Sequence, residues 1–314
     1  MKHVFLVNPT AGKGKQALMI EPKIKEYFSG KAYDWEIYKT RSQGDAQHYC
    51  NECAKSGESY RFYACGGDGT LYEVVNGVFG YPNCEVAVIP LGSGNDFVRL
   101  FGERERFIDI DAQVTGIPVE LDAIKCGEQI AINQCSMGLD AEVCANQARF
   151  KKLPGISGEA AYAAASVYCL FKDAGQQFTM QIDDNDPFTD KVLFCFAGNS
   201  RWYGGGFMAA PLAWPDDGVL DFSIVRKDRS RLRLLPLIKI YKQGKHLDMP
   251  FTHYQKGKRL KVHSDVPVTV NVDGECKQVT DCEFEIVPKA IKFVVPRFSD
   301  FHKHVAEMKA KNAN

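Results

Sequence analysis

The stretch Cys65-Gly66-Gly67-Asp68-Gly69-Thr70 follows the apolar-rich run Tyr60–Ala64 and precedes Leu71–Asn76, which has the character of the first turns of a helix. A strand that leads through a glycine turn into a helix is suited to holding phosphate. Glycines let the backbone approach a ligand closely, and the free amides and the helix dipole favour negative charge. Asp68 would repel phosphate unless a metal ion or a water molecule bridges the two. The alternative is a tight strand-to-helix connection without a ligand.

Two further strand ends in the first hundred residues carry loops of similar composition. Val4–Val7 leads into Asn8–Lys15, and Val86–Pro90 leads into Leu91–Phe97. Ligands of open α/β sheets collect at the carboxyl ends of the strands, so these loops are candidates for one site. Neither the P-loop spacing nor the Gly-x-Gly-x-x-Gly dinucleotide fingerprint occurs in them.

The chain alternates strands and helices up to about Asp122. Helices are predicted over Gln16–Phe28 and from Asp45 to about Lys55, with a strand over Trp35–Lys39 between them. This βαβ rhythm predicts a largely parallel, doubly wound sheet. Residues 1–122 are therefore expected to form an α/β domain.

Residues 123–296 have a different character, because short β-rich runs separated by turn residues dominate them. They predict a mainly antiparallel β domain, interrupted by helices over Gly158–Lys172 and Leu232–Gln243. The expected strands are Val119–Ile124, Gln129–Asn133, Phe178–Ile182, Lys191–Ala197, Leu220–Val225, Leu260–His263, Val268–Val272, Glu283–Val287 and Ile291–Val295. The last segment, Phe298–Lys311, is predicted to be helical.

The bulk composition narrows the function classes. Among 314 residues, 39 basic and 39 acidic side chains give zero net charge, which argues against a general nucleic-acid binder. No apolar stretch approaches the length that spans a bilayer, and the N-terminal apolar run is too short for a signal peptide. Eleven cysteines without a secretory signal indicate reduced thiols in a cytoplasmic protein. Cys50-x-x-Cys53, with His48 nearby, has no second ligand pair, which disfavours a zinc or redox site.

Taken in order, the three loops resemble the diacylglycerol kinase catalytic-domain family of soluble bacterial lipid kinases, whose relatives include the sphingosine kinases. The resemblance continues in Gly138-Leu139-Asp140-Ala141, in the run from Asn199 to Gly218, and in Val272-Asp273-Gly274-Glu275. NAD kinases share the Gly-Gly-Asp-Gly element, but the segment Gly92–Phe97 matches the lipid branch.

The resemblance implies an α/β nucleotide-binding domain and a C-terminal mainly antiparallel β-sandwich domain, with residues from about 297 to 314 returning to the first domain. It implies ATP and Mg²⁺ as cofactors. Lys13 and Lys15 are expected either to meet phosphates or to be solvated. The residues carried over as the nucleotide site are Asn8, Thr10, Gly12, Thr40, Gly66, Gly67, Asp68, Gly69, Thr70, Leu71, Tyr72, Ser93, Asn95 and Asp96.

Catalytic and metal-binding roles follow from the same resemblance. Asp68 is expected to connect to magnesium, whereas Asp96 either lies near the phosphates or caps the helix that begins near Phe97. Glu275 is the expected general base, with Asp273 supporting it or competing for the role. The alternative for these two acids is a simple Asp-Gly hairpin turn.

A second, structural magnesium site is carried over to Asp217, with the backbone carbonyls of Trp214 and Val219 completing it. The alternative is a surface turn.

The expected reaction is transfer of the γ-phosphoryl group of ATP to diacylglycerol, giving phosphatidate. The alternatives are another acceptor, such as a sphingoid base, phosphatidylglycerol or NAD, and a non-catalytic nucleotide- or lipid-binding regulator. The substrate implies peripheral contact with a membrane, at its inner face, and the family also allows a homodimer. The basic run Arg226–Leu235 beside Leu237–Tyr241 could attract anionic headgroups. An acyl-chain cleft could involve Tyr162, Tyr168, Leu170 and Phe171, with core packing as the alternative for both segments.

Overall fold

The computed structural model describes the whole chain apart from residues 152–157, 173–174, 228–237, 298, 300 and 302–314. The chain divides into two compact units, one formed by Met1–Leu121 with the segment from Lys289 onward, and the other by Asp122–Pro288. The sequence prediction placed the return to the first domain near residue 297. In the structure Lys289–Val295 already belongs to the first unit, because the last strand of the chain ends there.

The first unit is built on a parallel sheet with the strand order β2-β1-β3-β4-β13. The register pairs Val4 with Phe62, and Val86 with both Phe62 and Phe293. These interior strands are buried almost throughout, as expected when helices cover both faces of a parallel sheet. The strands are β1 (Lys2–Val7), β2 (Trp35–Lys39), β3 (Tyr60–Gly66), β4 (Cys84–Pro90) and the end of β13 (Glu275–Val295).

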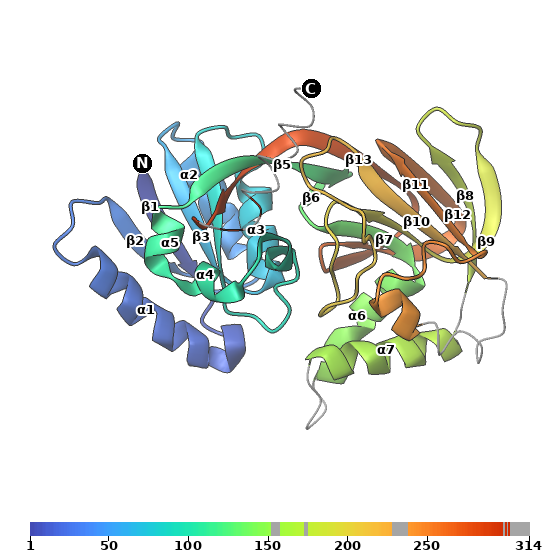
Figure 1. Cartoon of the computed structure of the whole chain (residues 1–314), viewed down its shortest axis with the longest axis horizontal. Helices are drawn as coiled ribbons and strands as arrows, with labels where there is room; N and C mark the ends of the chain where they lie inside the picture. The colour runs from blue at the N-terminus through green and yellow to red at the C-terminus, as the bar shows by residue number, and fades with distance from the viewer. Residues whose placement is uncertain (152–157, 173–174, 228–237, 298, 300, 302–314) are drawn as a thin grey trace. The chain divides into compact units, whose positions relative to one another are not determined.

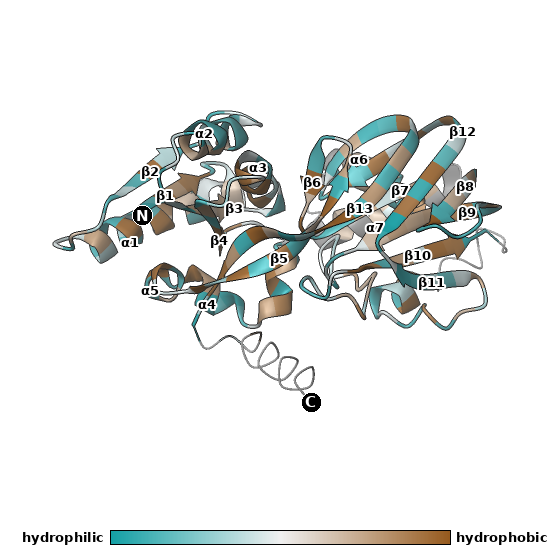
Figure 2. Ribbon diagram, turned by 90° about the horizontal axis from the view of Figure 1, so that it is seen from above, coloured by the Kyte–Doolittle hydropathy of each residue, from teal (hydrophilic) through white to brown (hydrophobic). Residues whose placement is uncertain are grey.

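Helices cover the two faces of this sheet (Figure 2). On one face, α1 (Lys15–Phe28) and α5 (Ile110–Val114) pack on a core in which the rings of Phe5 and Tyr63 stack at 4.1 Å. On the other face lie α2 (Asp45–Ala54) and α3 (Asp68–Val78). The unit also contains η1 (Ala11–Gly14), η2 (Phe97–Phe101) and α4 (Arg104–Ile108). The predicted doubly wound arrangement is confirmed.

The second unit is a mainly antiparallel β structure. Its strands run in the order β11-β10-β9-β7-β12-β13, and β8 pairs with both β9 and β12. In the first part of β12, from Arg259 to Ser264, buried residues alternate with more exposed ones. Figure 2 shows alternating hydrophobic and hydrophilic bands along this strand. β5 (Ile117–Cys126) begins in the first unit and ends in the second. The other strands of the second unit are β6 (Gln129–Ala131), β7 (Gln134–Gly138), β8 (Gln176–Ile182), β9 (Phe188–Gly198), β10 (Leu220–Arg226), β11 (Thr252–Gly257) and β12 (Arg259–Val272).

Two helices, α6 (Leu139–Lys151) and α7 (Gly158–Lys172), lie beside each other in the second unit (Figure 1). Val143 of α6 and Ala165 and Cys169 of α7 enter a buried apolar cluster with Phe194 and Phe196 of β9. The sequence predicted α7 but not α6.

Two pairs of predicted strands are single strands in the structure. Leu260–His263 and Val268–Val272 both belong to β12, whose pairing with β13 shifts register between His263 and Val268. Likewise, Glu283–Val287 and Ile291–Val295 belong to β13, although Lys289 has a φ of +51°.

Several predicted segments lie outside the described residues. They are most of the basic run after Lys227, the start of the helix predicted from Leu232, and almost all of the helix predicted over Phe298–Lys311. The side chains of Lys13, Tyr162, Leu170 and Phe171 are likewise not described. No helix in the described part of the chain is long and apolar enough to cross a membrane.

Candidate active site

In the first unit, the loops that follow β1, β3 and β4 meet at one edge of the parallel sheet. The Asn8 amide donates to Cys65 O at 3.1 Å, and the amides of Leu91 and Gly92 donate to Gly66 O at 2.8 and 3.0 Å. The Thr40 amide, after β2, donates to Val7 O at 3.0 Å. The structure thus brings together four segments that the sequence predicted to share a site.

Glycine allows two of these loops to approach closely. A Cβ atom at Gly92 would lie 2.5 Å from the Cα atom of Gly67, and one at Gly66 would lie 2.1 Å from Thr70 Oγ1. A side chain at position 92 would push the two loops apart, and one at position 66 would displace the Thr70 side chain. The sequence motif therefore has a packing role that holds without any ligand.

Asn8 organises the first loop. Its Oδ1 accepts from the Thr10 amide at 3.0 Å and from the Thr10 hydroxyl at 2.8 Å, while its Nδ2 donates to Thr70 Oγ1 at 3.4 Å. Gly12 follows with a φ of +58°, in the left-handed region that favours glycine. Asn8, Thr10 and Thr70 thus belong to one hydrogen-bonded group at the edge of the sheet.

Asp68 joins the second loop to the third. One carboxylate oxygen accepts from the Asn95 amide at 2.8 Å, and the other accepts from the Asp96 amide at 3.0 Å. A Cβ atom at Gly94 would approach Asp68 Oδ2 to 2.6 Å, so Gly94 leaves the space in which the carboxylate lies. Asp68 is therefore a structural anchor of the loop after β4. Its predicted link to magnesium stays a prediction.

Asp96 does not act as a helix cap. It occupies the residue before η2, but its side chain makes no capping hydrogen bond. Its carboxylate instead lies 2.9 Å from Arg99 Nε, and the residue is 4% exposed. Of the two interpretations left open by the sequence, the cap is wrong.

The remaining predicted nucleotide residues differ in exposure. Ser93 is exposed, and Gly69 has no atom within 4 Å of its would-be Cβ, so both lie at an open surface. Leu71 and Tyr72, both in α3, are 4% and 8% exposed, so their side chains are buried. Gly67 is the residue that precedes the first turn of α3.

Glu73 of α3 is a neighbouring residue that the sequence reasoning missed. Its two carboxylate oxygens accept from the amides of Gly44 and Ala46 at 2.9 and 3.1 Å. The carboxylate therefore satisfies donors at the start of α2, close to the loop that contains Thr40.

In the second unit, Asp273-Gly274-Glu275 forms the tight turn between β12 and β13, with φ of +47° at Asp273 and +103° at Gly274. The Asp273 carboxylate accepts from the amides of Ile132, Asn133 and Gln134 at 2.6, 3.1 and 2.8 Å. These donors stabilise its negative charge and use its lone pairs. Asp273 therefore anchors the turn that contains the half-buried Glu275, and the catalytic roles of both acids stay predictions.

Asp217 lies in a turn with Trp214 and Val219, as the metal prediction requires, but a cation of the protein already contacts it. Lys256 Nζ lies 2.8 Å from Asp217 Oδ2 and 3.5 Å from Asp221 Oδ2, and the Val219 amide donates to Asp217 Oδ1 at 3.2 Å. Burial acts to lower the pKa of Lys256, but hydrogen bonding to Asp217 and the charge of Asp221 outweigh it and raise the pKa.

Magnesium at this turn stays a prediction for the described residues. Among them, no group of three or more His, Cys, Asp and Glu side chains is arranged to hold a metal. The site predicted at Asp217 is of another kind, one carboxylate with two backbone carbonyls, and in the Cys50 and Cys53 pair Cys50 is buried.

Asp122 and Asn199 support the turn that contains Asp217. Asp122 is 2% exposed, and its Oδ2 accepts from the Gly218 amide at 2.8 Å. The Nδ2 of Asn199 donates to the carbonyls of Asp122 and Ile132, each at 2.8 Å. The sequence reasoning missed Asp122, because Val119–Ile124 has only the pattern of a strand.

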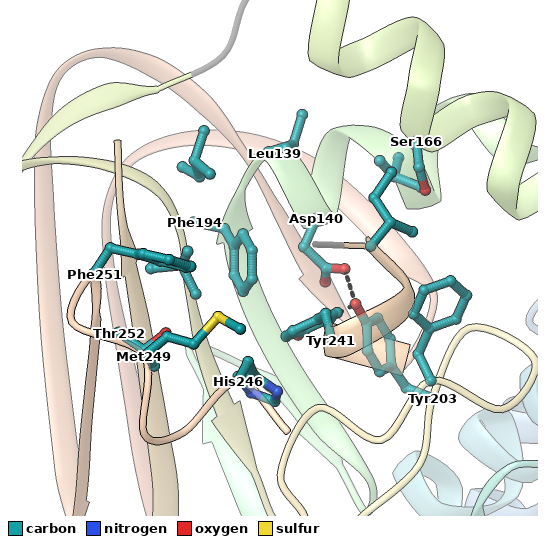
Figure 3. Close-up of a pocket in the computed structure, with 15 residues that line it drawn as sticks. Leu139, Asp140, Ser166, Phe194, Tyr203, Tyr241, His246, Met249, Phe251 and Thr252 are labelled. Atoms are coloured by element: carbon teal, nitrogen blue, oxygen red, sulfur yellow. Dashed lines mark hydrogen bonds between the residues drawn. The ribbon is translucent and has the colours of Figure 1, made fainter. Parts of the chain in front are cut away.

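An apolar pocket opens in the second unit between α6, α7, strands β9 and β10 and the segment from Ile238 to Thr252 (Figure 3). Its wall includes Val143, Leu193, Phe194, Phe207, Met249 and Phe251. Burial lowers the pKa of His246, another lining residue, to about 4, so this imidazole is neutral near pH 7.

One wall of this pocket is polar. Asp140 accepts from Ser136 Oγ at 2.6 Å and from the Tyr203 hydroxyl, and the hydroxyls of Tyr203 and Tyr241 lie 3.4 Å apart (Figure 3). Burial raises the pKa of Tyr241 well above its usual value, so its hydroxyl keeps its proton. The pocket thus combines a hydrocarbon-lined interior with one hydrogen-bonding group. Among the α7 side chains that the structure describes, Ser166 lines the pocket and Tyr168 does not.

Two family descriptions match this chain. The diacylglycerol kinase catalytic domain matches residues 2–129, and the YegS C-terminal NAD kinase beta sandwich-like domain matches residues 133–295. The diacylglycerol kinase of Staphylococcus saprophyticus is 30% identical over 277 residues, which cover 86% of this chain and 88% of that protein. The chain belongs to the diacylglycerol kinase catalytic-domain family of lipid kinases.

This lipid kinase is also 27% identical over 298 residues to the diacylglycerol kinase of Bacillus subtilis, covering 93% and 96% of the two chains. A solved diacylglycerol kinase structure from Bacillus anthracis has a TM-score of 0.68 at 20% identity and covers 94% of this chain and 97% of that one. An NAD kinase from Archaeoglobus fulgidus, solved in complex with ATP, has a TM-score of 0.51 at 10% identity and covers 98% of both chains. The predicted combination of an α/β domain and a β-rich domain is confirmed.

Proposed function

We propose that this lipid kinase transfers the γ-phosphoryl group of ATP to the hydroxyl of diacylglycerol and so produces phosphatidate. The bond between the γ-phosphorus and the oxygen that bridges to the β-phosphate breaks, and a bond from the same phosphorus to the lipid oxygen forms. ADP leaves, and the hydroxyl proton passes to a base on the protein. Relatives with the name diacylglycerol kinase support this acceptor.

The apolar pocket of the second unit is the observation that carries the lipid part of the proposal. A pocket for an acyl chain needs hydrocarbon walls and few polar groups, and the side chains of Phe194, Phe207 and Met249 meet that need. A soluble acceptor would instead leave these walls in contact with polar groups. Asp140 and Tyr203 supply one polar group at which a lipid hydroxyl could bind.

The nucleotide belongs at the loop edge of the first unit. There the glycine turn before α3 presents backbone to phosphate, with Asn8 and Thr70 beside it. An NAD kinase with a similar fold was solved in complex with ATP, which supports ATP as the nucleotide. Magnesium that arrives with ATP would neutralise phosphate charge, and Asp68 is the acid in the turn closest to that role.

Glu275 is the base in this proposal. It lies in a tight turn that Asp273 anchors through backbone amides, so its backbone is held while its side chain remains half-buried. A carboxylate positioned on the attacking hydroxyl contributes about 10²–10⁴-fold to the rate.

Access to the substrate requires contact with a lipid surface. Since no described helix could span a bilayer, we place the kinase at the surface of a membrane, at its cytoplasmic face, while it acts.

The direct test supplies purified protein with γ-labelled ATP, magnesium and dispersed lipids. Dioleoylglycerol, sphingosine and phosphatidylglycerol are presented in the same detergent, each with and without protein, and Glu275→Gln is the matched variant. We expect labelled phosphatidate from the first lipid only. Label on another lipid would replace the acceptor, and no label on any lipid with folded, nucleotide-binding protein would reject the reaction.

A further inference from the structure

Two thiols flank the turn that presents Glu275. Cys276 follows Glu275 directly at the start of β13, and Cys144 lies in α6. Cys144 Sγ lies 3.7 Å from the carbonyl oxygen of Gly274, and Cys276 Sγ lies 3.9 Å from the same oxygen. The two sulfur atoms therefore cannot be further apart than the sum of these two short distances.

A second contact places the Cys276 sulfur on the side of α6 that carries Cys144. Its Sγ lies 3.8 Å from the carbonyl oxygen of Ala141, which precedes Cys144 by three positions in the helix. Residues three apart in an α-helix are neighbours on one face. The Cys276 sulfur therefore lies over the helical face that carries the Cys144 side chain. A disulfide needs this kind of facing approach with little backbone movement.

Several other described thiols are poor partners for oxidation. Burial raises the pKa of Cys84 to about 11 and that of Cys195 to about 12, and it raises the pKa of Cys135 and Cys282 well above the usual value. A raised pKa leaves little thiolate, which is the reactive form. Four described cysteines are only partly buried, namely Cys53, Cys144, Cys276 and Cys282, and among them Cys144 and Cys276 both contact the Gly274 carbonyl oxygen.

We propose that Cys144 and Cys276 are a redox modification site, at which a peroxide oxidises the two thiols to an intramolecular disulfide. One thiolate attacks the peroxide oxygen, the O–O bond breaks, and a sulfenic acid and one water form. The second thiolate then attacks the sulfenic sulfur and displaces hydroxide, which takes up a proton to become the second water. In sum, two thiols and one hydrogen peroxide give one disulfide and two waters, and a dithiol reverses the change.

The consequence for catalysis rests on the proposed function of Glu275. A covalent bond from residue 276 to α6 restrains the residue next to the base, in a turn where Asp273 and Gly274 already hold positive φ. A small misplacement of a catalytic group can lower a rate by about 10²-fold. We therefore expect the oxidised kinase to be at least about tenfold slower than the reduced one.

The first measurement does not depend on activity. The full chain is treated with hydrogen peroxide at a few equivalents, remaining thiols are blocked with N-ethylmaleimide under denaturing conditions, and the digest is analysed by mass spectrometry without reduction. We expect a cross-linked peptide pair containing Cys144 and Cys276, lost on dithiothreitol treatment. If these two thiols are blocked to the same extent before and after peroxide, or are oxidised separately, the proposed bond does not form.

Three variants complete the test. Cys144→Ser and Cys276→Ser should each abolish the cross-link, and their lipid-kinase rates should change less than about twofold with peroxide. Cys53→Ser, a partly buried thiol on α2 of the first unit, should behave as the wild type. A cross-link with no loss of rate would overturn the catalytic consequence alone. An enzyme without lipid-kinase activity before oxidation would refute the proposed function and leave the peptide result valid.

Discussion

Hydrogen bonding distinguishes the roles of Asp273 and Glu275, the two acids of the β12–β13 turn. Because three backbone amides use the oxygens of Asp273, replacing it by Asn leaves at least one amide without an acceptor. We expect Asp273→Asn to lower the free energy of unfolding by about 1–3 kcal/mol. Glu275→Gln should instead lower kcat by about 10²–10⁴-fold with little change in stability.

Urea denaturation and steady-state kinetics of both variants distinguish the roles. ATP affinity should stay near the wild-type value in Glu275→Gln. If Asp273→Asn were as stable as wild type yet inactive, the supporting role assigned to Asp273 would be wrong and its role as the base would return.

Lys256 supplies the positive charge beside Asp217 and Asp221, the second of which is 1% exposed. Burial raises the pKa of Asp221, which shows how much its carboxylate depends on a nearby cation. We expect Lys256→Met to lower Tm, and added Mg²⁺ or Ca²⁺ to restore part of the loss. Without nucleotide, the Tm of wild type should not respond to these ions. An equal rise in both proteins would instead support the metal site that the resemblance implied at Asp217.

Two buried histidines make stability depend on pH. Burial lowers the pKa of His3 and of His246 from 6.5 to about 4, so each stays neutral in the folded chain while it takes up a proton when unfolded. Between pH 6.5 and 4 the unfolded state therefore binds more protons, and stability falls as the pH falls. Each histidine contributes up to about 3 kcal/mol to this loss, and chemical denaturation of His246→Gln and wild type at pH 7 and 5 should reveal a smaller loss in the variant.

The hydrogen-bond partners of single residues could not be predicted from the sequence. The motifs mark Asp68 and Asp273 as candidate functional acids. The backbone amides that bond to them, at Asn95 and at residues 132–134, could not be predicted, because they come from loops far away in the chain. Resemblance supplied a role for each acid, whereas the hydrogen bonds show what holds it. The cation beside Asp217 was unpredictable for the same reason, since Lys256 lies on another strand.

Among the elements, the loop that follows β4 depends most directly on glycine. Gly92→Ala would bring a Cβ atom to within 2.5 Å of the Gly67 Cα atom, so the two loops would have to separate. We expect a loss of about 1–3 kcal/mol in stability and weaker binding of ATP. Gly69→Ala, in the first turn of α3 with no neighbour within 4 Å, is the matched substitution and should not destabilise the fold. Equal losses in thermal denaturation of the two variants would contradict this packing argument.

Element types were predictable wherever the local pattern was strong. The strands and helices of the first unit follow apolar runs and glycine turns, so the βαβ order emerges directly. The helix α6 was missed because Leu139–Lys151 mixes small, polar and apolar residues without a clear apolar stripe. β13 was predicted as two strands, whereas in the structure it runs through Pro288 and through Lys289, whose φ is +51°.

At the scale of the whole molecule, the division into an α/β unit and a β-rich unit could be predicted from the change of pattern at about Asp122. The use of β13 by both units could not, because β4, its partner in the first unit, is separated from it by most of the chain. Its first part pairs with β12, and Phe293 pairs with Val86 of β4. A chain that ends at Pro288 should therefore lose the strand beside β4. We expect it to aggregate on expression, as measured by its soluble fraction beside that of the full chain.

The pairing of β13 with β4 also affects when the first unit can fold during synthesis. During synthesis, the first α/β segment leaves the ribosome long before residues 289–295 do, and β4 then waits with an open hydrogen-bonding edge. Early folding of a separate N-terminal domain, as in most two-domain nascent chains, cannot be completed here. We therefore expect the first unit to reach its native fold only after residues 289–295 have been synthesised. Until then, a chaperone could bind the unpaired edge of β4.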